Sequence, residues 1–533
     1  MNEVSQHPGI NASENATDLV MHLVANLTLH PEILRFLVVY LVTPCVLYHS
    51  ACYLWTMKWL ATKDSLSSLP LPDGIMGLPI IGETLHFLFV GERYERRRRK
   101  QFGNVYKTHL FGRPTVVLIG EENIRPILLG EGNLVEAVWP ETTRRILGTN
   151  GIVNGDKNTH TKIKRLALRA FSPKFINKYS PVMISRIESH IKEWQSRDSI
   201  SVFEACTQMV SKTMMTVLLG ISPDDPDIQR YIQAEEDIVN SILCLPIALP
   251  GFSFYKGLKA QEFIFKKVET KLRPRLESSV EDDLSDEKSG AESVMVNILK
   301  LARAEQKTII TLENLQNLSL EFIFAGSQSL RCSSSLLMLH LSQRPQIIER
   351  LRQEIREVGL WDTPLVNLQH ENFNKLPYLC RVVNETMRVT PTIPGAIRVA
   401  LKTFQVGKYQ IPKGWQVIYS IRFTHEEAAG KILHKEDKTR FEPEKDLHDP
   451  ENEITDNNID GAKSKASSFS FVPFGKGARM CAGKNYGLLF LRLFLFQLVR
   501  SVDINLVTKA NIATSPMMRA HKSVKIAVKP YNE

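Results

Sequence analysis

A single cysteine set among glycines near the C-terminus constrains this chain more than any other feature. The stretch Phe471–Gly483 reads FVPFGKGARMCAG, and a mostly apolar run from Tyr486 to Val499 follows it. Glycines allow tight turns and let the backbone approach a large flat ligand. The apolar run is typical of a helix, whose N-terminal dipole favours a thiolate over a thiol. The pattern indicates that a buried Cys481 thiolate can bind iron, while Arg479 pairs with a carboxylate of the same ligand.

Taken alone, a cysteine after a glycine-rich turn is more often a free buried thiol. The full spacing Phe474-x-x-Gly477-x-Arg479-x-Cys481-x-Gly483, however, resembles the haem-binding loop of the cytochrome P-450 superfamily. The resemblance implies a haem whose iron is held by the Cys481 thiolate, in a loop to which Phe474 and Gly475 also belong. It further implies that Arg479 pairs with a haem propionate.

Composition narrows the class of protein. Of the 533 residues, 43% are hydrophobic and 23% are charged, as in ordinary globular proteins. The net charge of +10 suggests a membrane or an acidic partner protein nearby, and not nucleic acid, because no nucleic-acid motif accompanies it. The seven cysteines are scattered and contain no Cys-x-x-Cys pair. They are therefore neither a disulfide framework nor a zinc site, and a reducing cytosolic environment is the simplest account.

An apolar segment near the N-terminus predicts a membrane anchor. Phe36–Met57 is 22 residues without Asp, Glu, Lys or Arg, and a helix of that length spans roughly 33 Å, enough for a bilayer core. The alternative is a cleaved signal peptide, but the segment starts late and is too long for one. We expect a single transmembrane anchor at 33–60.

Charge and sequons on either side of the anchor predict its orientation. Three Asn-x-Ser/Thr sequons precede it, whereas basic residues follow it, including the run Arg96–Lys100. Because positive residues favour the cytoplasmic side, residues 1–32 should form a lumenal tail, with the catalytic part cytosolic at the endoplasmic reticulum membrane. We expect the Arg96–Lys100 run to be a solvated helix face that can also touch anionic headgroups.

The rest of the chain divides into a hinge and one large domain. Residues 61–82 are rich in proline and glycine and are expected to form a stiff hinge. Val105–Gly120 alternates in the manner of a small β-hairpin sheet, and apolar residues at helical spacing dominate elsewhere. The expected fold is mainly α with a minor β-sheet, a cytochrome P-450 fold over residues 83–533 on an N-terminal transmembrane helix.

Two acid–base patterns fit the resemblance. Glu385 and Arg388 lie three residues apart on one helix face, a common ion pair that resembles the structural Glu-x-x-Arg pair of the superfamily. The arginine that usually joins this pair, in a Phe-x-Pro-x-Arg segment, is replaced here by Lys445 after Phe441 and Pro443. Lysine keeps the positive charge but lacks the planar guanidinium of arginine, so the interaction of Lys445 with the Glu385–Arg388 pair is expected to be weaker.

The segment Ala325-Gly326-Ser327-Gln328-Ser329 resembles the oxygen-binding part of a long helix, Ala-Gly-x-acid-Thr, although a plain kink in a core helix is the alternative. In the superfamily the acid and the alcohol relay protons. Here Gln328 stands at the acid position and cannot carry a proton, whereas Ser329 can still donate a hydrogen bond. We expect activity that is slower or that leaks peroxide.

Further cationic residues match positions that bind the haem propionates. Arg398, after Pro394-Gly-Ala-Ile, is one. His160-Thr-Lys-Ile-Lys164 stands where many members have Trp-x-x-x-Arg, so Lys164 is the expected partner there. Each of these residues is also compatible with an ordinary surface charge.

Several longer stretches resemble the retinoic acid hydroxylase family (family 26) within the superfamily. They are 106–116, 135–140, 169–172, 398–404 and 409–415. The resemblance implies an apolar site that binds retinoic acid or a similar acid. In this chain the site would be lined by the Leu245-Pro246 loop, Ala325 and Pro516 together with Trp139, Pro394, Gly395 and Met517, although each could instead be ordinary core.

The resemblance also implies the partners. No flavin or nucleotide fingerprint is visible, so electrons should come from a separate NADPH-cytochrome P-450 reductase, which the basic residues Lys476, Arg479 and Lys484 would suit. The expected function is monooxygenation of an apolar small molecule. Two alternatives stay open: a haem or retinoid binding protein with little turnover, and an oxygen-independent isomerase on the same fold.

Overall fold

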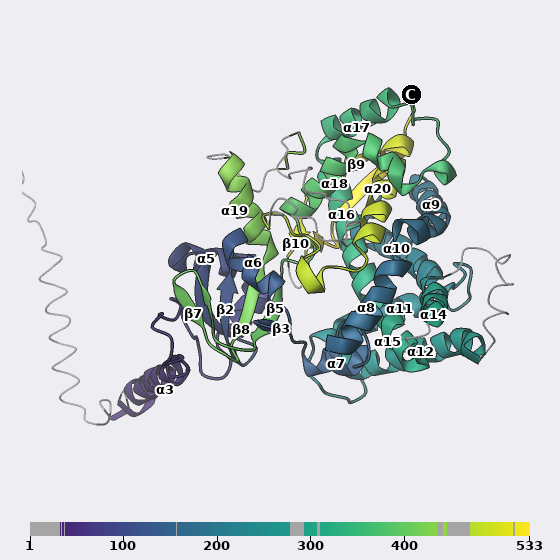
Figure 1. Cartoon of the computed structure of the whole chain (residues 1–533). Helices are drawn as coiled ribbons and strands as arrows, with labels where there is room; N and C mark the ends of the chain where they lie inside the picture. Colours follow the sequence, from purple (N-terminus) through teal and green to yellow (C-terminus); the bar gives the residue numbers. More distant parts are fainter. Residues whose placement is uncertain are drawn as a thin grey trace, which may run out of the picture.

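The computed structural model describes residues 32, 35–36, 38–155, 157–277, 293–305, 310–433, 441–444, 469–514 and 517–532. Helices make up its larger part, on the right of Figure 1, and a smaller part on the left is built on a five-stranded sheet. The expected fold class, mainly α with a minor β-sheet, is confirmed.

The α-helices carry most of the described chain. They are α3 (Thr43–Leu60), α4 (Thr84–Val90), α5 (Glu92–Phe102), α6 (Glu121–Leu129), α7 (Glu141–Leu147), α8 (Lys157–Ala170), α9 (Pro173–Gln195), α10 (Val202–Leu219), α11 (Ile228–Ile242), α12 (Ser253–Glu277), α14 (Val294–Ala304), α15 (Leu312–Phe322), α16 (Gln328–Ser342), α17 (Pro345–Glu357), α18 (Pro377–Val389), α19 (Ile421–Leu433) and α20 (Lys484–Ser501). In the described part of the chain the π-helical turns are η1 (Val38–Val42) and η3 (Ile323–Ser327), and the 3₁₀ turns are η4 (Leu365–Asn367), η5 (His370–Lys375) and η7 (Gly477–Arg479).

The strands of the described residues form four sheets. They are β1 (Val105–Leu110), β2 (Arg113–Leu118), β3 (Val135–Ala137), β4 (Ile200–Ser201), β5 (Gly395–Ala400), β6 (Phe404–Val406), β7 (Tyr409–Ile411), β8 (Gln416–Ser420), β9 (Val502–Leu506), β10 (Ile512–Ala513), β11 (Arg519–Ala520) and β12 (Lys525–Pro530). The largest sheet has the order β1-β2-β8-β5-β3, with β2 and β8 parallel and the other neighbours antiparallel.

The hairpin predicted within Val105–Gly120 is present. β1 and β2 pair antiparallel, and the turn between them has positive φ at Phe111 and Gly112 (54° and 77°), as a tight two-residue hairpin turn requires. The prediction of a small hairpin sheet was too narrow, however, because β8, β5 and β3 extend it. Local alternation marks a strand but does not say which distant strand pairs with it.

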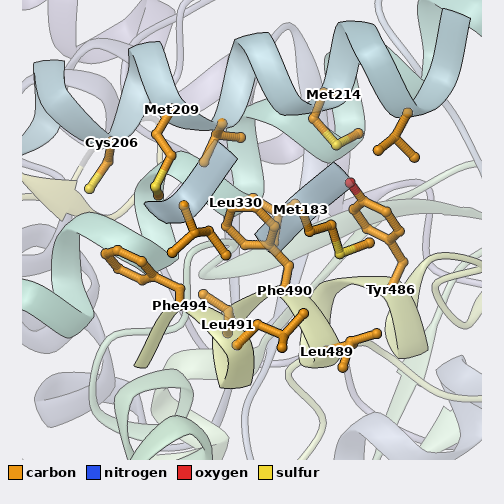
Figure 2. Packing of buried hydrophobic residues seen from close by; sticks show 14 of the residues in the cluster. Met183, Cys206, Met209, Met214, Leu330, Tyr486, Leu489, Phe490, Leu491 and Phe494 are labelled. Atoms are coloured by element: carbon orange, nitrogen blue, oxygen red, sulfur yellow. The ribbon is translucent and has the colours of Figure 1, made fainter. Parts of the chain in front are cut away.

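The main hydrophobic core lies among the helices. Every residue of α20 from Tyr486 to Val499 is buried, which explains why the run is apolar on all sides. In Figure 2 the side chains of α10, Met209 and Met214 among them, point toward α20. Leu330 of α16 lies near Phe490 of α20 in the same packed layer. This core holds the helix that follows Cys481 against the long α15–η3–α16 helix.

The N-terminal helical run stands apart from the core, at the lower left of Figure 1. Val38–Leu60 is 23 residues with a mean hydropathy of 1.3, and none of its apolar window is buried. Within the described residues it is the one helix long and apolar enough to cross a membrane. Its C-terminal end touches the sheet domain, where Trp55 and Trp59 flank His109, with ring centroids 4.9 and 5.5 Å from the imidazole.

The expectation of a solvated Arg96–Lys100 run was wrong for much of the run. Arg96 makes two hydrogen bonds to Glu426 of α19, at 2.8 and 2.6 Å. Arg98 is buried and pairs with Glu83. All five residues of the run are charged, so the sequence gives no sign of which ones face inward. The inward-facing arginines are stabilised by carboxylates of other segments, where an apolar residue would usually mark the buried face of a helix.

Candidate active site

The loop that carries Cys481 is shaped by close backbone contacts. The Cys481 amide donates to the Phe474 carbonyl at 3.0 Å, and η7 forms the turn between them. Gly477 has φ of 71°, and a Cβ there would overlap the Leu128 carbonyl oxygen at the end of α6. Glycine at 477 therefore lets the loop pack directly on α6. Gly475, with φ of 67°, makes the preceding turn.

The Cys481 thiol is a free, exposed cysteine at the head of α20. Surrounding protein atoms desolvate it even so, and this burial raises the pKa of the thiol, against smaller opposing effects of the Gly483 amide, Lys164 and Lys484. Without a bound group, desolvation therefore has the largest effect on the Cys481 pKa, and α20, whose dipole was expected to lower it, begins only at Lys484. A bound cation is what would favour the thiolate here.

Two of the predicted propionate partners meet at one carboxylate. Arg479 and Arg398 each donate through Nε to Glu131, at 2.9 Å to Oε1 and 2.9 Å to Oε2. The Ala137 amide also donates to Glu131 Oε1, at 3.1 Å. Arg398 comes from β5 and Arg479 from η7, so the arrangement joins the large sheet to the Cys481 loop. Glu131 was not predicted from the sequence, where nothing local distinguishes it from any exposed glutamate.

Lys164 and His160 approach the same loop from α8. Lys164 is buried and its Nζ donates to the Ala478 carbonyl at 2.5 Å. Burial lowers the Lys164 pKa, while the nearby Cys481 opposes this. His160, which stands at the position of a tryptophan in many superfamily members, is also buried, and its Nε2 has no hydrogen-bond partner among the residues that the structure describes. Burial and then Arg479 lower the His160 pKa to about 4, so the ring is neutral and can donate one hydrogen bond.

The segment matched to oxygen binding forms a π-helical turn. η3 (Ile323–Ser327) interrupts the run from α15 to α16, and such single widened turns often occur at functional sites. The Ser329 hydroxyl donates to the carbonyls of Ala325 at 2.7 Å and Gly326 at 3.2 Å. Gln328 is buried, and its Oε1 accepts from Arg331 Nε at 2.9 Å. Ala325 itself is exposed although it lies within the longest helical run.

A buried acid one turn earlier ties this helix to the loop before α8. Both Glu321 carboxylate oxygens accept backbone N–H groups, from Ile152 at 2.7 Å and Val153 at 2.8 Å. Burial raises the pKa of Glu321 to about 7, against these hydrogen bonds. The Ile152 carbonyl in turn accepts from Arg479 Nη1 at 3.0 Å. The role of Glu321 as a cap for a distant loop was not predicted, because nothing in the local sequence indicates which loop a buried glutamate will bind.

The residues predicted to contact substrate lie on neighbouring segments. The Met518 amide donates to the Thr392 carbonyl at 3.1 Å, which places Met517 beside the Pro394–Gly395 segment. β3 pairs with β5, with Ala137 opposite Arg398, so the chain enters the Trp139 region next to that strand. Trp139 is 37% exposed and Leu245 is 72% exposed, and Pro516 lies outside the described residues. The structure brings Met517, Pro394 and Gly395 together, and their contact with substrate stays a prediction.

The pair Glu385–Arg388 is buried within α18. Arg388 makes two hydrogen bonds of 2.7 Å to the Glu385 carboxylate, and the Glu442 amide donates to the same carboxylate at 2.8 Å. The segment after Phe441 therefore does reach the pair. Lys445, the third member predicted from the sequence, lies outside the described residues.

The donor set fits a haem. Within the described ranges no group of three or more His, Cys, Asp or Glu side chains could hold a bare metal ion, so iron at Cys481 needs a macrocycle to supply its other ligands. Cationic Arg479, Arg398 and Lys164, with the unpartnered His160 Nε2, suit the carboxylates of such a group.

Comparison with known proteins identifies the family to which the chain belongs. The sequence model of the Cytochrome P450 family matches residues 72–530. Cytochrome P450 26A1 of Danio rerio is 34% identical over 466 residues, covering 86% of this chain and 90% of the relative. Cytochrome P450 26B1 of Homo sapiens is 32% identical over 462 residues, covering 86% of each chain.

Solved structures agree with the sequence comparison. The retinoic acid bound cyanobacterial CYP120A1 has a TM-score of 0.74 at 27% identity, covering 87% of this chain and 100% of that chain. These matches confirm the predicted fold, the haem cofactor and the likeness to family 26. This chain belongs to the cytochrome P450 family, as a haem monooxygenase similar to the retinoic acid hydroxylases.

Proposed function

We propose that this protein hydroxylates retinoic acid or a related apolar carboxylic acid, using dioxygen and electrons from NADPH-cytochrome P450 reductase. The observation that supports it most is the convergence of the Cys481 loop with Arg479, Arg398 and Lys164. Haem, when bound there, supplies the iron that activates dioxygen. In this proposal the Cys481 thiolate would bind the haem iron, and Phe474 and Gly475 shape the turn that presents it.

The cationic residues hold and orient the haem propionates. Arg479 and Arg398 offer guanidinium forks from two different elements, and Lys164 offers a point charge from α8. His160 would donate through Nε2, a buried ring nitrogen for which the structure gives no partner among the described residues. Glu131 keeps both arginines pointed at one place, because it accepts from each.

The widened turn η3 and the residues after it are where the proposal places proton transfer. Ser329 keeps its hydroxyl on the Ala325 and Gly326 carbonyls of η3, where it can turn to donate elsewhere. Gln328 has its carbonyl oxygen occupied by Arg331, which leaves its amide N–H groups as donors. Neither residue holds an exchangeable proton of the kind that a carboxylic acid would carry.

The substrate class rests on the relatives and on the apolar lining. The retinoic acid bound relative shares 27% identity over its whole length. Pro394, Gly395 and Met517 lie together here, and Trp139 lies next to their strand. An apolar wall of this kind would bind a polyene chain by burial of its surface.

The anchor and the electron donor complete the proposal. Val38–Leu60 would hold the protein as a single-pass anchor in the endoplasmic reticulum membrane, with residues 1–32 lumenal and the domain from residue 83 cytosolic. The expected basic docking face for an acidic reductase needs one correction. Arg479 points inward to Glu131 and the Ile152 carbonyl, so Lys476 and Lys484 remain as its expected contributors.

Reconstitution tests this function directly. The full-length haem protein is combined with NADPH-cytochrome P450 reductase and lipid, and retinoic acid and retinol are offered separately. We expect retinoic acid to gain one oxygen atom, and retinol, which lacks the carboxylate, to react at least about tenfold more slowly. Cys481→Ser, which removes the thiolate, should form no product.

A control distinguishes a sample in which reductase and haem protein do not work together from one in which the proposed substrate is wrong. Electron transfer is checked in each sample by the rate of NADPH oxidation. Steady NADPH oxidation without any oxygenated retinoid would contradict the substrate assignment. Product from both retinoids at equal rates would contradict recognition of the carboxylate.

A further inference from the structure

A buried charged cluster lies behind the widened turn, on the side of α10 and α11. Glu235 of α11 is completely buried, and its Oε1 lies 3.4 Å from Nη1 of Arg331 on α16. Arg331 is 3% exposed and donates through Nε to Gln328 Oε1 at 2.9 Å. A carboxylate on a neighbouring helix is thus connected, through one guanidinium, to the side chain at the position where the superfamily carries its acid.

The cluster is incompletely hydrogen-bonded. Neither Glu235 oxygen has a hydrogen bond of ordinary geometry to the described residues, and neither does Arg331 Nη1. The hydroxyls of Ser211 on α10 and Ser327 in η3 are buried and face Glu235 closely enough to lower its pKa as hydrogen-bond donors, although their geometry in this structure is not that of an ordinary hydrogen bond. A pair kept only for stability is normally fully hydrogen-bonded, because unpaired buried charge is costly. Such a group of unsatisfied polar atoms is suited to ordered water.

The carboxyl titrates near neutral pH. Burial raises the pKa of Glu235 to about 7, against Arg331, which lowers it, and with the adjacent Glu236, which raises it. One more charge stands nearby: Arg519 of β11 shares the Phe203 ring with Arg331, the two guanidinium carbons lying 5.0 and 5.9 Å from the ring centroid. A group with this pKa can both give and regain a proton at the pH of the cytosol.

We propose that Glu235 supplies the acid function that position 328 lacks, holding the exchangeable proton of the widened turn and acting through Arg331, Gln328 and Ser327. A Glu235 oxygen gives its proton to a water molecule bound by the cluster, which then serves as the proton donor at the widened turn, and the carboxylate regains a proton passed on from bulk water; Arg331 and Gln328 orient this water and do not carry the proton. Glu235 is therefore unchanged after each cycle, and the protons consumed come from solvent. Glu235 is a positioning residue in this scheme, since it touches neither substrate nor haem. The inference rests on the proposed monooxygenase site but not on the identity of the substrate.

The test compares Glu235→Gln with a matched control, Glu95→Gln. Glu95 on α5 also has a pKa raised by burial to about 7, but none of the contacts above involves it. The first readout is the infrared absorption of protonated carboxyl groups in the purified holoprotein, titrated from about pH 5 to 9. We expect a band that disappears with a midpoint near pH 7 and is weakened in each variant.

The second readout tests whether Glu235 delivers protons to the site. Peroxide released per NADPH oxidised, with reductase and without any retinoid, measures how well protons are delivered. In the wild type this leak should rise as the pH passes about 7, where Glu235 loses its proton. Glu235→Gln should leak at the high-pH level throughout, Glu95→Gln should follow the wild type, and Gln328→Glu added to Glu235→Gln should restore low leakage.

A further variant covers the possibility that Glu235→Gln does not fold. Arg331→Gln removes the cation that lowers the Glu235 pKa, so the midpoint of both the infrared band and the leak should move to higher pH. A pH profile of leakage that is the same in wild type, Glu235→Gln and Arg331→Gln would overturn the inference. Neither readout needs a retinoid product, so failure of the substrate assignment alone would leave this result interpretable.

Discussion

At the scale of single residues, comparing two glycines distinguishes two reasons why a side chain would destabilise the Cys481 loop: an unfavourable backbone conformation and a steric overlap. Gly475 and Gly477 both have positive φ, at 67° and 71°. Nothing lies within 4 Å of a Cβ built at Gly475, whereas a Cβ at Gly477 would overlap the Leu128 carbonyl oxygen. Both glycines belong to the motif around Cys481, but the structure requires them for different reasons. Gly475 is needed for its backbone conformation alone, whereas Gly477 is needed also because the Leu128 carbonyl leaves no room for a Cβ.

Gly477→Ala should harm the protein more than Gly475→Ala. The left-handed conformation costs an alanine about 1 kcal/mol at either position, and at 477 the displaced α6 backbone adds on the order of 2 kcal/mol. Urea unfolding, with bound haem per chain as a second measure, checks this. Equal losses in the two variants would show that the contact with Leu128 does not matter.

Glu131 holds the two arginines that we assign to the propionates. It accepts from Arg479, Arg398 and the Ala137 amide, and its own charge has the same sign as a propionate. The carboxylate therefore competes with haem for the same guanidinium groups, and this competition weakens haem binding.

Glu131→Gln should slow the loss of haem, by about tenfold if the repulsion is worth about 1.4 kcal/mol. The rate of haem transfer to an acceptor globin measures it, with Glu136→Gln as the control, because Glu136 is an exposed neighbour on β3. Faster haem loss in Glu131→Gln alone would mean that Glu131 matters more for placing the arginines than for opposing the propionates.

At the scale of elements, local patterns predicted what depends on neighbours in sequence. The helix after Cys481, the β1–β2 hairpin and the Glu385–Arg388 pair follow from apolar runs, alternation and i,i+3 spacing. The contacts that local patterns did not predict are those between segments far apart in the chain. The inward arginines of α5 and the Glu321 cap of Ile152 both meet partners contributed by distant elements.

The segment after the anchor shows the same dependence on distant partners. Proline and glycine predict a stiff hinge, and the structure adds that Gln410 of β7 fastens it. Gln410 is 1% exposed; its Nε2 donates to the Leu69 carbonyl at 2.5 Å, and its Oε1 accepts from the Asp64 amide at 2.9 Å. Trp415 Nε1 also donates to the Thr62 hydroxyl at 2.8 Å. The end of the anchor is thereby tied to the sheet domain.

Gln410→Leu should release this segment. The partly buried Asp64 amide and Leu69 carbonyl would lose their partner, at a cost of about 1 kcal/mol each, and trypsin should then cut after Lys63 several-fold faster. Gln405→Leu is the control, because Gln405 is an exposed residue paired with Gln410 across the β6–β7 ladder, and its side chain donates locally to the Gly407 carbonyl. Unchanged cleavage after Lys63 in Gln410→Leu would show that other contacts hold the hinge.

At the scale of the whole molecule, buried titratable groups of opposite kinds shape the pH dependence of stability. Burial raises the pKa of Glu235 and of Glu321 from 4.5 to about 7, so the folded state binds more protons and stability falls as the pH rises between those values. Burial lowers the pKa of His340 from 6.5 to about 3 and that of His109 to about 4, so stability is lost as the pH falls below 6.5. The two effects oppose each other between about pH 4.5 and 6.5.

Glu321→Gln should therefore make stability less sensitive to pH. The wild type should lose more stability than the variant when the pH is raised from about 5 to 7.5, by up to about 3 kcal/mol for a group with this shift. Urea midpoints at the two pH values measure the difference, with the exposed Glu136→Gln as a control. A variant whose midpoint changes with pH as much as that of the wild type would mean that Glu321 titrates in the folded state as it does in the unfolded chain.

The central claim is that the Cys481 thiolate binds the haem iron, and the absorption spectrum of the reduced protein under carbon monoxide tests it most directly. We predict the strongly red-shifted Soret band that thiolate ligation produces, its loss in Cys481→His, and a spin-state change when retinoic acid is added to the ferric wild type. A wild-type Soret band at the position given by histidine or neutral ligation would contradict the assignment of Cys481 and the function that depends on it.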